Sequence, residues 1–363
     1  MLMRHMRSLS DAVALPERWQ ILLLTCRDPA TDFRLPLAQE LQALGHDIAY
    51  VFLRRAPILT EMACPDAPHT FSLRSFFGHI RARLDSKSSL LVINSTNLAF
   101  PILSNVLRNI VGGLWCFDMH DDLLYGSAGY SRMRAKLAQR LLLRGSDFII
   151  HAAPTLQELF PASHHLGNAS SIAAIARPDA DFARILILAS LDARLDFAFL
   201  SAAAAVNPQL SFHIHGQLSQ SDPIVEDGLR TLTSGRPNVV YHGPYVNGDL
   251  PDLLRNYPVT LAPYITNSRL TRYIDPLRFY HCLNSGMEVI STDIPKARDL
   301  EAVLHIADAP EAIGALVERL RDRPETRRNP GSTQLEHNWR NRALKLLDLA
   351  AAVRDGRAGG ICS

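Results

Sequence analysis

The feature that most constrains this sequence is a repeated alternation of short apolar runs with longer stretches of helical character. Each run is rich in aliphatic residues and shows little polar alternation, as in strands buried on both faces of a parallel sheet. Strands that alternate with helices form βαβ units, so the pattern predicts a doubly wound α/β fold. The runs of the first half are Gln20–Cys26, Asp47–Leu53, Ser89–Ser95, Gly113–Met119 and Asp147–Ala153. Those of the second half are Arg184–Ser190, Leu210–Gly216, Asn238–Gly243, Val259–Tyr264, Glu288–Asp293 and a weaker Leu304–Ala307.

Two such series in one chain predict two Rossmann-like domains. The length of 363 residues suits this division, because each half can bury a core of its own. The break falls near Gly167–Phe182, where glycine, asparagine and proline punctuate the chain. We therefore expect a first domain over residues 1–170 and a second over 171–333. Residues 334–363 are expected to hold a long helix, His337–Val353, and a tail.

Composition excludes several classes of protein. The net charge is +2, so the concentrated basic excess of a nucleic-acid-binding protein is missing. The five cysteines are scattered and lack CxxC spacing, which argues against a disulfide scaffold or a structural zinc site and favours a reducing cytoplasm. The basic N-terminus lacks the apolar stretch of a signal peptide, and no run is long enough to span a membrane.

One predicted helix, Tyr130–Arg144, is basic and amphipathic. Cationic residues without any acid alternate along it with apolar ones. This composition indicates either a surface that touches anionic lipid head groups or an ordinary solvated helix face. The cations are Arg132, Arg134, Lys136, Arg140 and Arg144, and the apolar residues are Met133, Leu137, Leu141 and Leu142.

The segment Tyr264–Pro295 carries the pattern of an anion site. Asp275-Pro276 is a helix start signal, since aspartate caps free N–H groups and proline suits the first turn. A helix N-terminus at the carboxyl edge of a parallel sheet attracts anions. Hydrogen-bond donors and cations crowd around this start, where a diphosphate would sit, although an ordinary capped helix with arginines in solvent would look the same. They are Asn267, Ser268, Arg269, Thr271, Arg272 and Arg278.

Five phrases, in order, resemble bacterial glycosyltransferases of the two-Rossmann-domain GT-B fold that act in polysaccharide and glycolipid biosynthesis. YIDPLRFYHCLNSGMEVISTD (Tyr273–Asp293) is similar to the family's NPLKLYEYLAAGKPVVSTD, and LASLDARLDFAFL (Leu188–Leu200) to the opening of its second domain. The others are NVVYHGPYVNGDLPDL (Asn238–Leu253), WCFDMHDD (Trp115–Asp122) and EHNWRNRALKLL (Glu336–Leu347). The first hundred residues match only in their alternation of strand and helix.

The resemblance implies a metal-independent transferase without a cofactor. A nucleotide-sugar donor, which in this family is usually a UDP-sugar, would bind the second domain. A glycan or lipid-linked acceptor would bind the first, and the C-terminal helix would pack back across the domains. Helix dipole and cationic side chains would neutralise the leaving diphosphate in place of a divalent ion. We expect a cytoplasmic protein, and one of the two interpretations of Tyr130–Arg144 places it at the inner membrane face.

Catalytic candidates follow the fourth predicted strand of the first domain, at the carboxyl edge of its sheet. An inverting reaction needs a carboxylate there to deprotonate the acceptor, whereas a retaining one needs a histidine or backbone group against the donor sugar. Asp121 and His120 are favoured and Asp118 is a further candidate, while Asp122 is expected to cap the next helix. The alternative is that these groups are capping and surface residues, and as a metal site they are weak.

The remaining candidates for donor binding lie in the second domain. Arg194 would reach the diphosphate or instead pair with Asp192 or Asp196. Gly243 and Tyr245 would read the base through backbone groups and a stacking ring, unless they form a plain turn. Asp275, Ser268, Thr271, Arg272 and Arg278 would surround the diphosphate, and Tyr280 and His281 would contact the ribose.

Two departures from the family affect the donor site. His281 and Tyr273 stand where many retaining members carry a pair of glutamates, the second of which binds the ribose. The run Arg184–Ser190 also lacks the glycine pair that lets phosphate approach the backbone. The sequence therefore leaves an alternative open, a non-catalytic GT-B relative that binds a nucleotide sugar or glycan. An epimerase of the same fold is less favoured.

Overall fold

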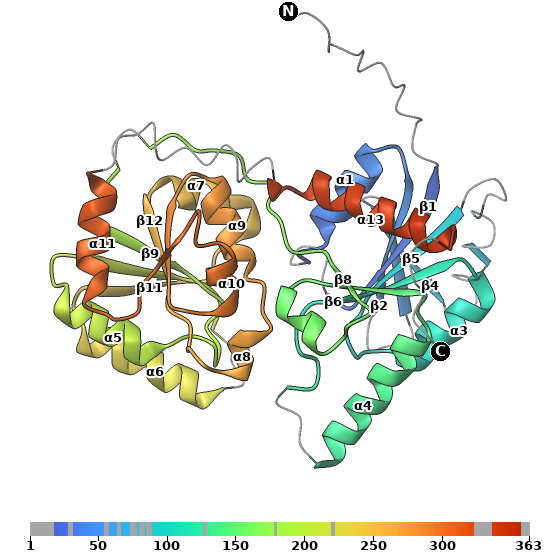
Figure 1. The fold of residues 1–363 in the computed structure, drawn as a ribbon, viewed down its shortest axis with the longest axis horizontal. Helices are drawn as coiled ribbons and strands as arrows, with labels where there is room; N and C mark the ends of the chain where they lie inside the picture. The colour runs from blue at the N-terminus through green and yellow to red at the C-terminus, as the bar shows by residue number, and fades with distance from the viewer. Residues whose placement is uncertain are drawn as a thin grey trace, which may run out of the picture.

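A computed structural model describes residues 18–27, 32–53, 58–63, 67–72, 78–79, 84, 89–125, 129–177, 180–218, 222–322 and 336–356. It shows two α/β domains side by side, each built around one sheet (Figure 1). The predicted fold class is confirmed. The domain limits at 170 and 333 stay predictions, as does the absence of a signal peptide, because the first 17 residues lie outside the described ranges.

The first sheet has eight strands in the order β4-β3-β2-β1-β5-β6-β7-β8. The strands are β1 (Trp19–Thr25), β2 (Asp47–Leu53), β3 (Ile58–Ala63), β4 (Ala67–Ser72), β5 (Ser89–Ser95), β6 (Leu114–Met119), β7 (Phe148–His151) and β8 (His164–His165). All pairings are parallel except those of β3 with β2 and β4. The antiparallel pair β3–β4 corrects the expectation of a purely parallel sheet. It adds an edge of the kind that large mixed sheets often carry.

Helices cover both faces of this sheet. They are α1 (Leu35–Ala43), α3 (Pro101–Val111), α4 (Gly129–Arg144), a 3-10 turn η2 (Pro154–Glu158) and α13 (Trp339–Arg354). Residues of α1 and α13 share one core with β1 and β2, and residues of α3 and α4 pack on the other face. The C-terminal helix thus returns to the first domain as expected, burying Trp339, Ala343, Leu346 and Leu347.

The second sheet has six parallel strands in the order β11-β10-β9-β12-β13-β14. They are β9 (Arg184–Leu188), β10 (Ser211–His215), β11 (Val239–Gly243), β12 (Val259–Ala262), β13 (Glu288–Ser291) and β14 (His305–Ile306). Its helices are α5 (Phe197–Val206), α6 (Pro223–Gly235), α7 (Leu250–Arg255), α8 (Arg269–Arg272), α9 (Leu277–Asn284), α10 (Pro295–Asp299) and α11 (Ala312–Arg321), with a 3-10 turn η3 (Asn247–Asp249). Residues of α5, α6 and α11 form the core on one face, and residues of α7, α9 and α10 form it on the other.

Side-chain caps fix where several helices begin. Asp196 accepts a hydrogen bond from the backbone N–H of Phe199 at 2.8 Å and so starts α5. Asn338 does the same for Asn341, also at 2.8 Å, at the start of α13. Each cap satisfies an N–H group that the first helical turn would leave unpaired, which is worth about 1 kcal/mol.

The carboxyl ends of β9, β10 and β11 are drawn together at a glycine. The Gly216 N–H donates to the Gly243 carbonyl at 2.9 Å, and the Ala189 N–H donates to the His215 carbonyl at 3.0 Å. A Cβ on Gly216 would lie 1.5 Å from the Ala189 carbonyl oxygen, so no larger residue fits. The backbones at the carboxyl ends of these three strands are therefore closely packed. Within the described ranges, no helix is long and apolar enough to cross a membrane.

Candidate active site

A buried ion pair anchors the first domain's side of the site. Asp118, at the end of β6, accepts hydrogen bonds from Nε and Nη2 of Arg34 at 2.7 and 2.8 Å. Both side chains are 0 % exposed. Burial raises the pKa of Asp118, but the Arg34 cation, His120 and a hydrogen bond from Ser95 outweigh it and hold the pKa below its ordinary value. Both carboxylate oxygens are occupied, so Asp118 is unsuited to the catalytic role suggested by its position.

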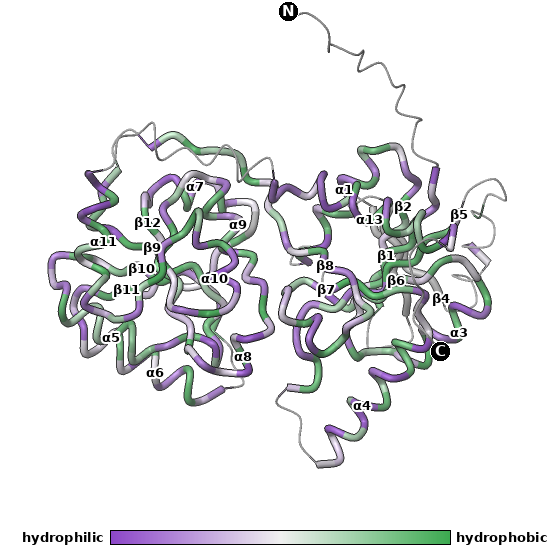
Figure 2. The backbone as a smooth tube through the Cα atoms, in the orientation of Figure 1, coloured by the Kyte–Doolittle hydropathy of each residue, from purple (hydrophilic) through white to green (hydrophobic). Residues whose placement is uncertain are grey.

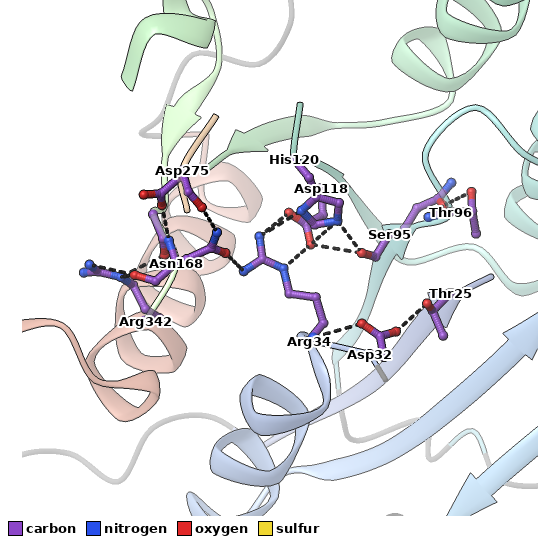
Figure 3. A network of polar contacts seen from close by, with 12 residues as sticks. Thr25, Asp32, Arg34, Ser95, Thr96, Asp118, His120, Asn168, Asp275 and Arg342 are labelled. Carbon is purple, nitrogen blue, oxygen red and sulfur yellow. Dashed lines mark hydrogen bonds and ion pairs between the residues drawn. The ribbon is translucent and has the colours of Figure 1, made fainter. Parts of the chain in front are cut away.

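His120 belongs to the same network (Figure 3). Its Nδ1 lies 3.3 Å from Arg34 Nη2 and its Nε2 lies 2.8 Å from Ser95 Oγ. A guanidinium only donates, so Nδ1 is the acceptor and Nε2 carries the proton that it donates to Ser95. Burial lowers the pKa of His120 to about 3, which keeps the ring neutral. Both ring nitrogens are therefore engaged in positioning the strand ends.

Asp121 differs from its two neighbours because no hydrogen bond or ion pair holds it within the described ranges. Burial raises the pKa of its carboxyl group, Arg194 and Arg27 lower it, and Asp192 and Asp275 raise it further. The net pKa is raised. Three of these four charges belong to the second domain, so Asp121 lies where the two domains face each other. A half-buried carboxylate with a raised pKa is suited to accept a proton.

Asp122 does not cap a helix, which corrects that expectation. Its carboxylate accepts a hydrogen bond from the N–H of Leu124 at 3.2 Å in a turn, and α4 begins only at Gly129. Its other oxygen pairs with Arg269 Nε of the second domain at 2.6 Å. Asp122 thus links the domains.

In the part of the chain that the structure describes, no three His, Cys, Asp or Glu side chains gather as a metal ion would need.

Asp275 also has a role that its sequence position did not predict. Helix α9 begins at Leu277 with Pro276 as its N-cap and without a side-chain cap, so the capping role assigned to Asp275 is wrong. Instead, Asp275 accepts hydrogen bonds from the Asn168 N–H and the Tyr280 hydroxyl, both at 2.6 Å. Lys296 Nζ lies 3.7 Å from the same carboxylate. Asp275 and Tyr280 therefore fix the start of α9 and are not free to bind a ligand.

Asn168 and Arg34 are the site residues that sequence reasoning missed. Asn168 lies in the connection between the domains, where its Oδ1 is 3.4 Å from Arg34 Nη1 and its Nδ2 donates to the Asp275 carbonyl at 2.6 Å. Arg342 of α13 donates to the carbonyls of Gly167 and Asn168 at 2.9 and 3.4 Å. Figure 3 shows the resulting chain of contacts from Asp118 to Asp275. The one sequence signal is the glycine-asparagine break, which by itself predicts only a domain boundary.

Arg278 is the cation best placed for a ligand. Its Nη1 is buried without a hydrogen-bond partner in the described ranges, and its guanidinium lies 4.8 Å from the centre of the Tyr264 ring. A buried donor without a partner carries a free-energy penalty that an anionic ligand would remove. Arg194, by contrast, pairs with Asp192 in the way the sequence left open, with Nη2 at 2.5 Å from Oδ2.

Three predicted donors around α9 are engaged elsewhere. The Ser268 hydroxyl accepts from the Leu270 N–H at 3.2 Å and caps α8, and the Thr271 hydroxyl donates to the Ile265 carbonyl at 2.7 Å. Arg272 is half exposed and pairs with Glu158 of the first domain at 2.9 Å. Together with the pair Arg269–Asp122, the last contact makes α8 a bridge between the domains.

The residues predicted to read the base and the ribose come from the end of β11, from the loop after it and from α9. Gly243 ends β11 with φ of +88°, and Tyr245 packs half-buried against the core under α7 and α9. His281 Nδ1 and the Ser170 hydroxyl are hydrogen-bonded at 2.8 Å. Burial lowers the pKa of His281 to about 4. At the end of β10, His215 stacks on His242 with ring centres 4.4 Å apart.

No known protein family and no curated protein matches this sequence. Solved structures do match. Sucrose-phosphate synthase from Thermosynechococcus elongatus superposes with a TM-score of 0.64 at 16% identity, over 93% of this chain and 100% of that one. The Anabaena protein HepE, solved with UDP and glucose, gives 0.63 at 11% identity, over 92% and 100%. A glycosyltransferase from Rickettsia africae gives 0.61 at 11% identity, over 93% and 99%.

The chain has the GT-B fold. The similarity to these structures lies in the arrangement of two Rossmann-like domains.

Proposed function

We propose that this GT-B protein is a hexosyltransferase that moves a sugar from a nucleotide-diphosphate donor, in the first place a UDP-sugar, to a glycan or lipid-linked acceptor. The fold supports this proposal, as do neighbours such as HepE and the pneumococcal O-GlcNAc transferase GtfA, which were solved with UDP and a sugar. The observation that carries it is the placement of Asp121, a carboxylate with a raised pKa and without a partner in the described ranges, facing the charges of the second domain.

Each side of the site has a role in this reaction. The acceptor hydroxyl attacks the anomeric carbon of the donor sugar while its proton passes to Asp121. The bond from that carbon to the diphosphate breaks, and the diphosphate leaves with additional negative charge. Arg278 and the first N–H groups of α9 stabilise this charge. We propose that these groups make a catalytic metal ion and a cofactor unnecessary.

His281 takes the place of the ribose-binding glutamate in this proposal. Because Ser170 holds Nδ1, the ring is oriented and Nε2 is the nitrogen left for a ribose hydroxyl. The low pKa keeps the imidazole neutral, so it offers a hydrogen bond without the charge of a carboxylate. We expect Gly243 and Tyr245 to contact the base of the nucleotide. We further propose that the enzyme acts in the cytoplasm, in polysaccharide or glycolipid assembly, and that nucleic acid is not a partner.

The proposal is tested by UDP release from a panel of UDP-sugars, with a bacterial lipid extract and oligosaccharides as acceptor sources. Asp121→Asn is expected to lower turnover by about 100-fold or more while UDP still binds. Asp227→Asn on α6, an exposed carboxylate paired with Arg230, is the matched control and should be neutral. An inverted anomeric centre in the product, read by NMR, agrees with a base at Asp121, whereas a retained one contradicts that role.

The alternative function is binding without turnover. The exchange of the family's glutamate for His281 favours it, because the ribose then loses a charged partner. Tight UDP binding with no UDP release from any donor or acceptor, by wild type and Asp121→Asn alike, would establish this alternative and remove the transferase proposal.

A further inference from the structure

Helix α4 projects from the first domain with little of its surface buried. Figure 1 shows its N-terminal end pointing away from the sheet, and only Gln139 and Leu142 are buried along its length. Tyr130 is 70% exposed, Met133 62% and Leu137 58%. With 3.6 residues per turn, these three side chains lie on one face of the helix, opposite the two buried residues. An apolar row standing in water is costly for a helix that has no other use for it.

The charge of α4 is of one sign. Five cations and no acid occur between Gly129 and Arg144, and none of the five forms an ion pair with any described residue. Elsewhere on the surface, arginines such as Arg230, Arg269 and Arg272 do have carboxylate partners. Figure 2 shows hydrophilic and hydrophobic segments alternating along this helix. The five are Arg132, Arg134, Lys136, Arg140 and Arg144.

We propose that α4 docks the first domain onto an anionic phospholipid bilayer. The row Tyr130, Met133 and Leu137 enters the boundary between head groups and acyl chains, while the cations beside it pair with lipid phosphates. The apolar row and the unpaired cations together favour an anionic bilayer over other ligands. A nucleic acid or an acidic protein would satisfy the cations and leave the apolar row in water, whereas a neutral bilayer would take the row and leave the cations unpaired.

The cation–π contact of Arg134 on Tyr130 fits the same surface. The guanidinium lies 5.8 Å from the ring centre, one turn from the exposed end of the helix. Tyrosine favours the membrane interface, since its ring is apolar and its hydroxyl is polar. Docking at a bilayer deepens the proposed function, because a lipid-linked acceptor would be presented at this surface. Vesicle binding can be measured whether or not the protein turns over a substrate.

The test is flotation of the full-length protein with vesicles of phosphatidylcholine, with or without phosphatidylglycerol. Wild type is expected to float with the anionic vesicles at low salt. Replacing Arg132, Arg134 and Lys136 by Gln should weaken partition on the order of 100-fold, at about fivefold for each cation. The matched control changes three exposed cations of the second domain, Arg230, Arg255 and Arg319, to Gln and should float as wild type does.

A second pair of variants tests the apolar row. Met133→Ser with Leu137→Ser should remove the part of the binding that survives high salt, because apolar insertion is not screened. Failure of wild type to float, equal flotation of the triple Gln variant, or binding to DNA or heparin in the absence of vesicle binding would overturn the proposal. UDP titration of the same variants separates the two proposals, since these substitutions should leave nucleotide binding unchanged.

Discussion

Removing Arg34 is expected to destabilise the first domain in a way that depends on pH. Arg34→Met leaves Asp118 without its cation in a site where the carboxylate is 0 % exposed. A buried carboxylate that loses its partner takes up a proton instead of staying charged. Protonating a group with an ordinary pKa of 3.8 at pH 7 costs about 4 kcal/mol, at 1.36 kcal/mol per pH unit. This agrees with the 3–5 kcal/mol typical for breaking a buried ion pair.

The direction of the pH effect follows from the two pKa values. In wild type the pKa of Asp118 is lowered, so its contribution to stability is present above about pH 4 and is lost on further acidification. In the variant the folded-state pKa is raised, so its stability falls as the pH rises above the unfolded value. The difference between the two proteins should therefore shrink to about 1.6 kcal/mol at pH 5.

Tryptophan fluorescence in urea measures this difference for the first domain alone. The three tryptophans of the chain, Trp19, Trp115 and Trp339, are all buried in the cores around the first sheet. The free energy of unfolding falls by about 2 kcal/mol per M of urea in a domain of this size, so the midpoint of urea unfolding should fall by about 2 M at pH 7. Arg140→Met, which removes an exposed cation, is the matched control. A shift below about 0.5 M at pH 7, or an equal shift at pH 5, would refute the reasoning.

Three further predictions concern acid behaviour and backbone packing. The acid limb of kcat/KM for UDP release should lie above pH 3.8, because the pKa of Asp121 is raised, and a limb at or below this value would argue against Asp121 as the base. The free energy of unfolding should fall on acidification from pH 6.5 towards 4, because His120 and His281 take up protons in the unfolded chain first. Each histidine should contribute up to about 1.4 kcal/mol per pH unit. A free energy of unfolding that stays constant over this range in urea titrations would contradict their low pKa values. Gly216→Ala should lower the melting temperature of the second domain in calorimetry, at a cost of about 1–3 kcal/mol, whereas Gly235→Ala, which meets open space, should be neutral; equal melting temperatures would refute the close approach.

The sequence predicted the strands better than the contacts between side chains. Central parallel strands such as β1 and β9 are apolar runs buried on both faces, and burial of this kind leaves a direct record in composition, whereas β10 and β11 alternate between buried and more exposed residues. The antiparallel strands β3 and β4 were missed because their segments, which include Pro68, carry no such run. The return of α13 to the first domain was predicted from the family resemblance, and the apolar side of that helix is confirmed as buried.

The site was predicted only in part because its contacts join distant positions. Arg34 meets Asp118 across 84 residues, and Asn168 meets Asp275 across 107. No period or motif links such pairs, so the sequence alone predicts Asp118, Asp275 and Tyr280 as free ligands. In the structure Asp118 pairs with Arg34, and the Tyr280 hydroxyl donates to Asp275. Asp121 and Arg278 stay candidates for the opposite reason, since neither has an ion-pair partner in the part of the chain described.

The most direct test of the account is calorimetric titration of the protein with UDP and with GDP, without metal and then with magnesium. We predict micromolar, metal-independent binding of UDP, weakened on the order of 30-fold in Arg278→Met, because a charge-assisted hydrogen bond to a phosphate contributes about 2 kcal/mol. Arg255→Met, which removes an exposed cation of α7, should bind UDP as wild type does. Absence of binding to either nucleotide, or equal binding by Arg278→Met, would contradict the donor site proposed for the second domain.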